Sequence, residues 1–230
     1  MHPNATIHNV DQGSDEWYAA RNGIITASEM NLILTPTLKK SDNAKTRAQV
    51  WEIAAQRIAG FTEPTYIGWN GERGHIDEVK AREAYNDHYE PVEELGFVTR
   101  EIEGVTLGYS PDGAGIMGNF GIECKSRVIK YQVETIVSNE VPVDHILQVQ
   151  AGLMVTGWDY IDYISYSAGL PMWVIRVEPE EKYQSAIIEA AVDFEAKVQE
   201  KVAEYMDRIK CVDVLIETER EEPEQEVYLG

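Results

Sequence analysis

The sequence predicts an α+β (mixed α/β) fold of one domain. Amphipathic helical patterns dominate the chain before Pro91, short segments rich in β-forming residues follow, and helix and strand then alternate before one long helix. The 230 residues are enough to bury a single core of generous size. We expect one domain over residues 1–216 and a loose acidic tail over residues 217–230, which hold six Glu and one Arg.

Four helices are expected in the first 90 residues. Ser14 can cap a short helix that Gly23 ends, because a serine hydroxyl accepts from the free amides at a helix start and glycine tolerates the left-handed exit. A second short helix follows Thr26. Residues 43–59 and 73–87 place apolar side chains at helical spacing, so each predicts an amphipathic helix.

Strands are expected next. Segments 95–102, 105–110 and 119–125 are short, rich in β-forming residues and separated by glycine-containing turns, which predicts an antiparallel three-strand meander. The remaining elements, in chain order, are helices near 129–137 and 144–156, strands at 159–166 and 172–177, and a helix over 180–209 whose apolar stripe should pack on the sheet.

The composition excludes several classes of protein. No apolar run approaches the roughly 18 residues that a membrane span needs. The first residues lack the basic and then apolar layout of a secretory signal, so we expect a cytoplasmic protein without a membrane partner. Cys124 and Cys211 are the only cysteines, too few for a disulfide framework or a four-cysteine zinc site.

The formal net charge of −20 argues at face value against a nucleic-acid partner, because phosphate binding depends on Lys and Arg. The acidity is concentrated at the C-terminal end, however, and residues 1–60 balance at six acids and six bases. A locally positive groove therefore remains possible. The candidates for its lining are Lys39, Lys40, Lys45, Arg47, Arg127 and Lys130.

The informative stretch is residues 110–113 (SPDG), followed after nine residues by an E-x-K triplet. Strand alternation points Glu123 and Lys125 the same way and Cys124 to the opposite face. If the two strands are neighbours, Asp112 comes within reach of Glu123, and two close carboxylates repel unless a cation neutralises them. Oxygen ligands favour Mg²⁺, with Mn²⁺ as a substitute, over zinc. Without further context, a turn acid and an exposed strand pair would explain the same residues.

Context comes from three further motifs. W-x-x-x-R-x-G-x-I-T-A-S-E occupies residues 17–29, G-x-x-x-E-x-x-A-R occupies residues 74–82, and Q-V-Q occupies residues 148–150. With the Asp and the E-x-K, these resemble the PD-(D/E)XK nuclease superfamily, and within it the phage lambda exonuclease and YqaJ-type viral recombinase family. The gap before the E-x-K is one residue longer than the family pattern, and Ser126 stands where a proline is common.

The resemblance implies a restriction-endonuclease-like core, with a central mixed sheet flanked by helices. It implies a metal-dependent 5′-to-3′ exonuclease that degrades one strand of linear double-stranded DNA to mononucleotides and leaves a 3′ overhang for strand annealing. A ring-shaped homotrimer, a single-strand annealing protein as partner and a phage or prophage origin in a bacterial host are implied as well. A PD-(D/E)XK endonuclease and a non-catalytic DNA-end or partner-binding module remain alternatives.

The resemblance also assigns residues to roles. Asp112 and Glu123 bind the metal together with the backbone carbonyl of Cys124, and Glu78 stands at the edge of the site, directly or through water. Lys125 orients the attacking water. The terminal 5′ phosphate is assigned to Arg21, Ser28, Ser110 and Gln148.

The choice of Gln148 over Gln150 follows from helix geometry. Residues two apart on a helix point in different directions, so both glutamines cannot line one pocket. His145, one turn before Gln148, and His75, beside Glu78, are interpreted as neutral surface or packing residues, and neither is assigned a contact with DNA.

Overall fold

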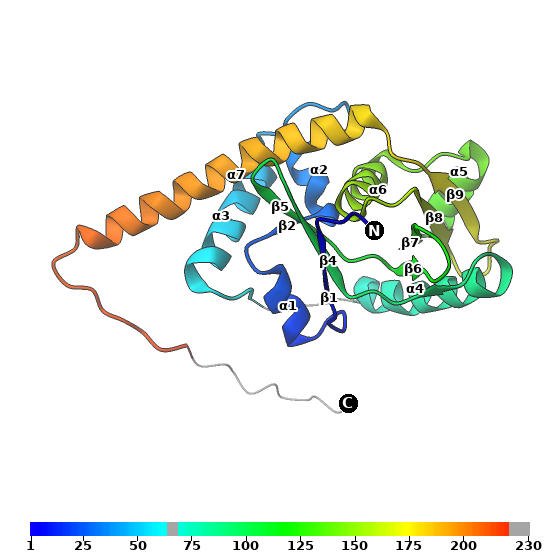
Figure 1. The fold of residues 1–230 in the computed structure, drawn as a ribbon, viewed down its shortest axis with the longest axis horizontal. Coiled ribbons are helices and arrows are strands. Elements are labelled where there is room, and N and C mark those ends of the chain that lie inside the picture. The colour runs from blue at the N-terminus through cyan, green and yellow to red at the C-terminus, as the bar shows by residue number, and fades with distance from the viewer. Residues whose placement is uncertain (64–68, 221–230) are drawn as a thin grey trace.

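The computed structural model describes residues 1–63 and 69–220, and it contains two mixed sheets flanked by helices (Figure 1). The predicted α+β class is therefore confirmed. Most of the predicted acidic tail, residues 221–230, lies outside the described residues. Within the described part of the chain, no helix is both long enough and apolar enough to cross a membrane.

Each sheet combines parallel and antiparallel pairs. In the first, β2 runs parallel to β5, and in the second, β7 runs parallel to β8. The first sheet has the order β1 (Ala5–His8), β4 (Phe97–Ile102), β5 (Val105–Tyr109) and β2 (Ile25–Thr26). The second has the order β3 (Val92–Glu93), β6 (Gly113–Gly115), β7 (Phe120–Ser126), β8 (Tyr160–Tyr166) and β9 (Trp173–Val177).

The helices begin and end close to where the sequence predicts. Ser14 Oγ accepts from the amide of Trp17 at 3.2 Å at the start of the first helix, and Gly60 ends the third in the left-handed region with φ of 79°. The helical elements are α1 (Asp15–Arg21), the 3₁₀ turn η1 (Ala27–Glu29), α2 (Met30–Ile33), α3 (Ala44–Ala59), α4 (Trp69–His88), α5 (Ile129–Ser138), α6 (Val143–Thr156) and α7 (Glu181–Lys210).

The predicted three-strand meander is wrong in its third strand. β4 and β5 pair antiparallel as expected, but β7 lies in the other sheet, between β6 and β8. The chain leaves the first sheet after Tyr109, and the glycine-rich segment supplies a strand of its own, β6. A side chain on Gly115 would stand 2.2 Å from the ring of Phe120, so glycine is what allows β6 to pack this closely.

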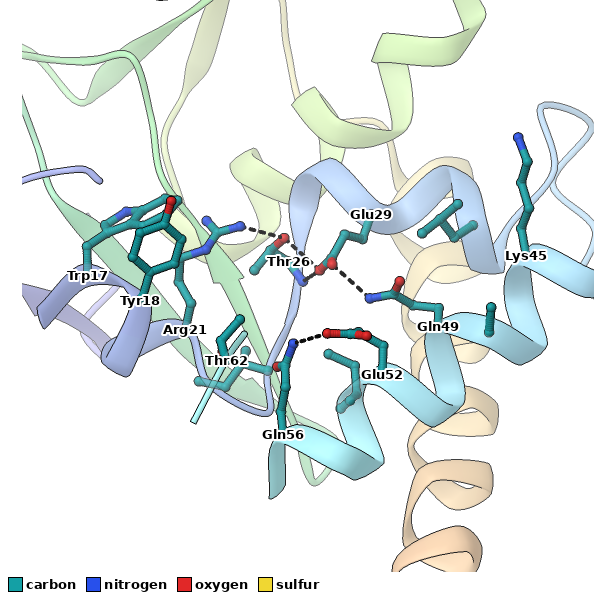
Figure 2. A pocket seen from close by; sticks show the side chains of 14 residues that line it. Trp17, Tyr18, Arg21, Thr26, Glu29, Lys45, Gln49, Glu52, Gln56 and Thr62 are labelled. Carbon is teal, nitrogen blue, oxygen red and sulfur yellow. Dashed lines mark hydrogen bonds between the residues drawn. The ribbon is translucent and has the colours of Figure 1, made fainter. Parts of the chain in front are cut away.

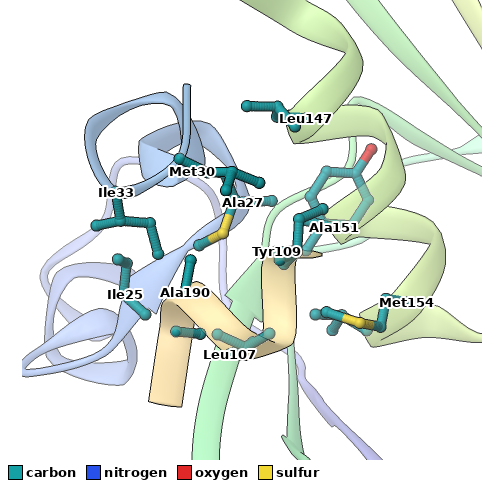
Figure 3. Packing of buried hydrophobic residues seen from close by; sticks show 14 of the residues in the cluster. Ile25, Ala27, Met30, Ile33, Leu107, Tyr109, Leu147, Ala151, Met154 and Ala190 are labelled. Atoms are coloured by element: carbon teal, nitrogen blue, oxygen red, sulfur yellow. The ribbon is translucent and has the colours of Figure 1, made fainter. Parts of the chain in front are cut away.

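The larger core lies between the first sheet and helices α2, α3, α6 and α7. Figure 3 shows Met30 from α2, Tyr109 from β5 and Ala151 from α6 pointing into it, with Ala190 of α7 closing one side. A smaller cluster fills the space between α4 and the second sheet, where Tyr85 packs against Ile122 and Cys124. One face of β7 supplies Phe120, Ile122 and Cys124 to this smaller cluster, so the residues between them point to the opposite side of the sheet.

Helix α7 departs from the predicted packing. Its buried residues run from Ile187 to Val198, whereas Tyr205 is exposed on the C-terminal part that projects from the body (Figure 1). The buried half lies against α3 and α6 more than against a sheet. Arg57 of α3 donates to both carboxylate oxygens of Glu195, at 2.6 and 2.8 Å, which fixes the two helices together.

Candidate active site

Asp112 and Glu123 face each other across two paired strands. Gly113 pairs with Ile122 in antiparallel register, so Asp112, one residue earlier, lies opposite Glu123, one residue later. Asp112 Oδ2 accepts from the main-chain N–H of Cys124 at 2.5 Å. The Asp112 carboxylate thus accepts a main-chain hydrogen bond of β7 just beyond the point where pairing with β6 ends. The proximity of Asp112 to Glu123 is the arrangement that the sequence predicts if the two strands are neighbours.

Glu123 and Lys125 share one face of β7. Lys125 Nζ lies 2.7 Å from Glu123 Oε1, and the side chain of Glu123 is 1% exposed. Cys124 points the other way, into the cluster beneath α4. The predicted alternation is therefore confirmed, and the alternative of an exposed strand pair is excluded by the burial of Glu123.

Two further side chains hold Glu123 in place. Tyr109 Oη donates to Glu123 Oε2 at 2.8 Å, and Gln148 Nε2 donates to Glu123 Oε1 at 2.5 Å. The family resemblance assigns Gln148 to the phosphate, whereas its side chain here contacts the carboxylate of Glu123. The sequence motifs give Tyr109 no role, although an aromatic residue on the strand that leads into Asp112 is a signal for it.

Gln150 confirms that only one glutamine of the Q-V-Q motif faces the site. It is fully buried, its Nε2 donates to the carbonyl of Glu178 at 2.9 Å, and its Oε1 accepts from the N–H of Glu180 at 2.9 Å. It therefore ties α6 to the segment before α7.

Glu78 and Arg82 approach the same site from α4. Arg82 Nη1 donates to Glu78 Oε1 at 3.2 Å and to the main-chain oxygen of Asp112 at 2.9 Å. Burial raises the pKa of Glu78, although Arg82 opposes that shift. No three Asp, Glu, His or Cys side chains of the described residues come close enough together to form a metal site by themselves. Glu78 nevertheless lies close enough to Asp112 and Glu123 for their charges to interact.

The charges of the site are strongly coupled. Burial raises the pKa of Asp112 well above its usual range, and the nearby charges of Glu123 and Glu78 raise it further. Burial disfavours the Lys125 ammonium, but the charges of Glu123 and Asp112 outweigh this and raise the pKa of Lys125. Lys125 is therefore an ammonium at neutral pH.

The donor atoms present suit a hard divalent cation. Asp112 and Glu123 supply carboxylate oxygens, and the neighbouring thiol of Cys124 points away from them, into the cluster beneath α4. The N–H and C=O of a strand residue point to the same edge, so the carbonyl of Cys124 faces the side where its N–H meets Asp112 and the pairing with β6 has ended. Carboxylate and carbonyl oxygens of this kind are the ligands that Mg²⁺ and Mn²⁺ prefer.

A second cluster of donors lies beside the carboxylates. Arg21 Nη1 donates to Ser110 Oγ at 3.3 Å and Nη2 to Thr26 Oγ1 at 3.4 Å, and Thr26 Oγ1 lies 3.1 Å from Ser28 Oγ. The structure thus brings together Arg21, Ser28 and Ser110 of the predicted phosphate residues. It adds Thr26, which sequence reasoning quoted in a motif without a role.

Trp17 organises this cluster. Its indole N–H donates to Ser110 Oγ at 2.9 Å, and the guanidinium of Arg21 lies over its ring, 4.1 Å from the centroid. A cavity of about 560 Å³ begins at Arg21 and runs between α1 and α3 (Figure 2). Figure 2 shows the guanidinium pointing to Thr26, with Glu29 and Gln49 hydrogen-bonded behind it.

The fold and the site together define a nuclease of the PD-(D/E)XK class. The model of the YqaJ-like viral recombinase domain matches residues 16–159, and the chain belongs to this family. The predicted family is therefore confirmed, and the chain is a nuclease that acts on DNA. A search of the curated proteins finds no match.

Solved structures agree with this assignment. An alkaline exonuclease (LHK-Exo) from Laribacter hongkongensis is 27% identical with a TM-score of 0.72, over 86% of this chain and 98% of that chain. A structure of LHK-Exo in complex with dAMP gives the same values. A phage related exonuclease from Haemophilus somnus 129PT shares the fold, with a TM-score of 0.56 at 13% identity over 79% of this chain and 96% of that chain.

Proposed function

We propose that the protein is a Mg²⁺-dependent exonuclease that degrades one strand of linear double-stranded DNA from its 5′ end. It releases mononucleotides and leaves a 3′ overhang. The observation that carries the proposal is the turn that bears both Ser110 and Asp112. Ser110 accepts a hydrogen bond from Arg21. Asp112, which follows Ser110 by two residues in the chain, faces Glu123. Two residues span about 7 Å at most, so a phosphate held at Ser110 keeps the next phosphodiester close to Asp112.

The polarity follows from the Arg21 cluster. A guanidinium grips two phosphate oxygens with parallel donors, and the hydroxyls of Ser28 and Ser110 complete the set. A terminal 5′ phosphate that fills this cluster positions the first phosphodiester at the carboxylates, so binding energy at the end orients the bond to be cut. An internal phosphate carries a second ester bond in place of a free oxygen. One donor of the cluster then loses its acceptor, so an internal phosphate fits the cluster less well than a terminal one.

The chemical step relies on residues of β7. Asp112, Glu123 and the Cys124 carbonyl would hold a Mg²⁺ ion, for which Mn²⁺ would substitute, with Glu78 at its edge. Such an ion would lower the pKa of a water, whose proton would pass to solvent, and would neutralise charge on the phosphate. Lys125 remains protonated, so it donates to the attacking water and to phosphate oxygen and does not act as the base. Tyr109 and Gln148 keep the carboxylate of Glu123 oriented through the step.

The wider setting is proposed on the same resemblance. A homotrimeric ring would enclose duplex DNA, and the overhang would pass to a single-strand annealing protein in the cytoplasm of a bacterial host of the phage. Basic side chains at the start of α3 and α5, among them Lys45 and Lys130, are candidates to line the channel, as is Lys39 in the segment before α3. Lys40 and Arg47 instead lie beside Asp193 and Asp42, at 3.5 and 3.2 Å, which reduces their part in it.

One gel tests the proposal. Linear duplex with and without a 5′ phosphate is incubated with Mg²⁺, Ca²⁺ or EDTA, beside a covalently closed circle. We expect digestion of the linear DNA in Mg²⁺, faster with the 5′ phosphate, and an intact circle. Cutting of the circle would instead favour an endonuclease, and binding without cleavage in Mg²⁺ or Mn²⁺ would favour a DNA-end-binding module.

A further inference from the structure

The turn that carries Asp112 is held by donors from three remote segments. Each of its three consecutive residues accepts from a different side chain. The contacts are Trp17 Nε1 to Ser110 Oγ at 2.9 Å, Gln12 Nε2 to the Pro111 carbonyl at 2.9 Å, and Arg82 Nη1 to the Asp112 carbonyl at 2.9 Å. Residues from two helices and a loop restrain this turn, so its side chains stay in one place.

Arg82 differs from the other two donors because it also contacts the carboxylate cluster. The same Nη1 that reaches Asp112 lies 3.2 Å from Glu78 Oε1, and Nη2 donates to Glu94. The Arg82 side chain is 12% exposed, whereas that of Glu94 is 77% exposed. One half of the guanidinium therefore points into the site and the other half points toward solvent.

Glu78 and Asp112 come from separate parts of the fold, one from α4 and one from the turn between β5 and β6. Glu78, Asp112 and Glu123 lie close enough for their charges to interact, and like charges at such a place repel one another when the three groups are ionised. A planar guanidinium with fixed donor directions holds two acceptors at a set spacing, which a flexible ammonium does not. Arg82 is placed to oppose this repulsion.

We propose that Arg82 is a positioning residue that sets the distance between Glu78 and the Asp112 turn, and thereby the affinity of the site for its divalent cation. The inference rests on the proposed function, because it concerns the metal that the nuclease uses. It assigns a role to the arginine of the G-x-x-x-E-x-x-A-R motif, which the reaction scheme leaves without one.

If Arg82 acted only through its charge, its replacement would change the metal affinity in the opposite direction. A guanidinium beside the site repels Mn²⁺ or Mg²⁺, so its removal would tighten metal binding if charge were its only contribution. Loss of a group that orients metal ligands instead weakens binding, commonly by about 10- to 100-fold. The direction of the change therefore separates positioning from charge.

The experiment measures Mn²⁺ binding to the full-length protein by calorimetry without DNA, and the Mg²⁺ concentration that gives half-maximal cleavage. For Arg82→Gln we expect both constants to rise by about 10- to 100-fold, with much of the rate recovered at saturating metal. Arg82→Lys keeps the charge and loses the fixed donor directions of Nη1, so we expect a rise in the same direction. Glu94→Gln removes only the solvent-side partner and should leave both constants within about twofold, because exposed ion pairs contribute little.

The outcomes are separable. Unchanged or tighter Mn²⁺ binding in both Arg82 variants, in a wild type that cleaves DNA, overturns the role of Arg82 and leaves the nuclease proposal intact. A wild type without metal-dependent cleavage overturns the proposed function instead. If thermal unfolding shows that Arg82→Gln is not folded, the metal-binding constants of Arg82→Lys decide whether Arg82 positions the site. A drop in melting temperature with unchanged metal constants would make Arg82 a merely structural residue.

Discussion

Lys125 and Glu123 form an ion pair on a single face of β7, with Nζ 2.7 Å from Oε1, and Glu123 is almost completely buried. The pair lies next to the turn that carries Asp112. A carboxylate buried this deeply needs charged or hydrogen-bonding partners around it. The pair is therefore the natural first target for mutation.

Lys125→Ala should abolish cleavage while DNA binding persists. We expect the single-turnover rate on linear duplex to fall by about 10²- to 10⁴-fold, because the variant lacks the group that orients the attacking water. Binding is measured by gel shift in Ca²⁺ or EDTA, and thermal unfolding checks that the variant is folded at the assay temperature. Unchanged overhang production would remove Lys125 from the chemical step.

Tyr109→Phe isolates one donor to Glu123. The ring and its packing stay, but Oε2 loses the hydroxyl 2.8 Å away. Because hydrogen bonds to charged groups contribute about 1.5–3 kcal/mol, we expect a loss of stability of that order in urea unfolding. Saturating Mg²⁺ should restore part of it, since a cation would replace the missing donor. A variant as stable as the wild type without metal would contradict this role.

The two glutamines of α6 should differ in their effect on activity. Gln148→Ala removes a donor to buried Glu123, so it should lower the cleavage rate by at least tenfold and reduce stability about as much as Tyr109→Phe, whereas Gln150→Ala should leave the rate close to that of the wild type. Gln150→Ala leaves the buried groups of Glu178 and Glu180 unpaired and should cost about 1–3 kcal/mol in unfolding. Equal effects of the two variants on both measurements would show that the helix as a whole, and not these contacts, matters.

Arg21→Gln tests the recognition of the DNA end. The wild type should prefer 5′-phosphorylated over 5′-hydroxyl ends, and the variant should lose most of this preference. A charge-assisted hydrogen bond of about 1.5–3 kcal/mol corresponds to a change of roughly 10- to 150-fold in the rate ratio. The rate on 5′-hydroxyl ends serves as the internal control and should change much less. A preserved preference would place the phosphate elsewhere.

His145 should make the protein sensitive to acid. Its Nδ1 lies 2.7 Å from the hydroxyl of Tyr163, and burial, with the charges of Lys125 and Arg127, lowers the pKa of His145 from 6.5 to about 3. The unfolded chain therefore binds a proton below pH 6.5 that the folded chain refuses, so stability is full above that pH and falls as the pH drops toward 3.

The loss attributable to His145 amounts to about 2 kcal/mol at pH 5. His145→Gln, which does not titrate, should show a smaller decrease in unfolding free energy between pH 7.5 and pH 5. Urea unfolding at the two pH values measures the difference. A decrease as large as that of the wild type would mean that His145 is not the group responsible. The low pKa also agrees with the interpretation of His145 as a neutral packing residue.

Most helices were predictable because their signals are local. Ser14 and Gly60 mark ends through their own hydrogen bonding and backbone freedom, and apolar spacing marks the buried faces between them. Strands β1 and β3 were missed, since β1 has only four residues with a mixed burial pattern and β3 has two. Segments this short are strands only because they form main-chain hydrogen bonds with a neighbouring strand, β4 for β1 and β6 for β3.

The residue sequence by itself determined the class of fold, the family motifs and the common face of Glu123 and Lys125, because side-chain alternation within a strand needs no partner. Only the tertiary structure decided that β7 belongs to the second sheet and that Gln148 contacts Glu123. It also decided that Arg82 joins α4 to the Asp112 turn. Such relationships depend on how distant segments pack, and periodicity along a chain does not encode which neighbour a strand or helix will meet.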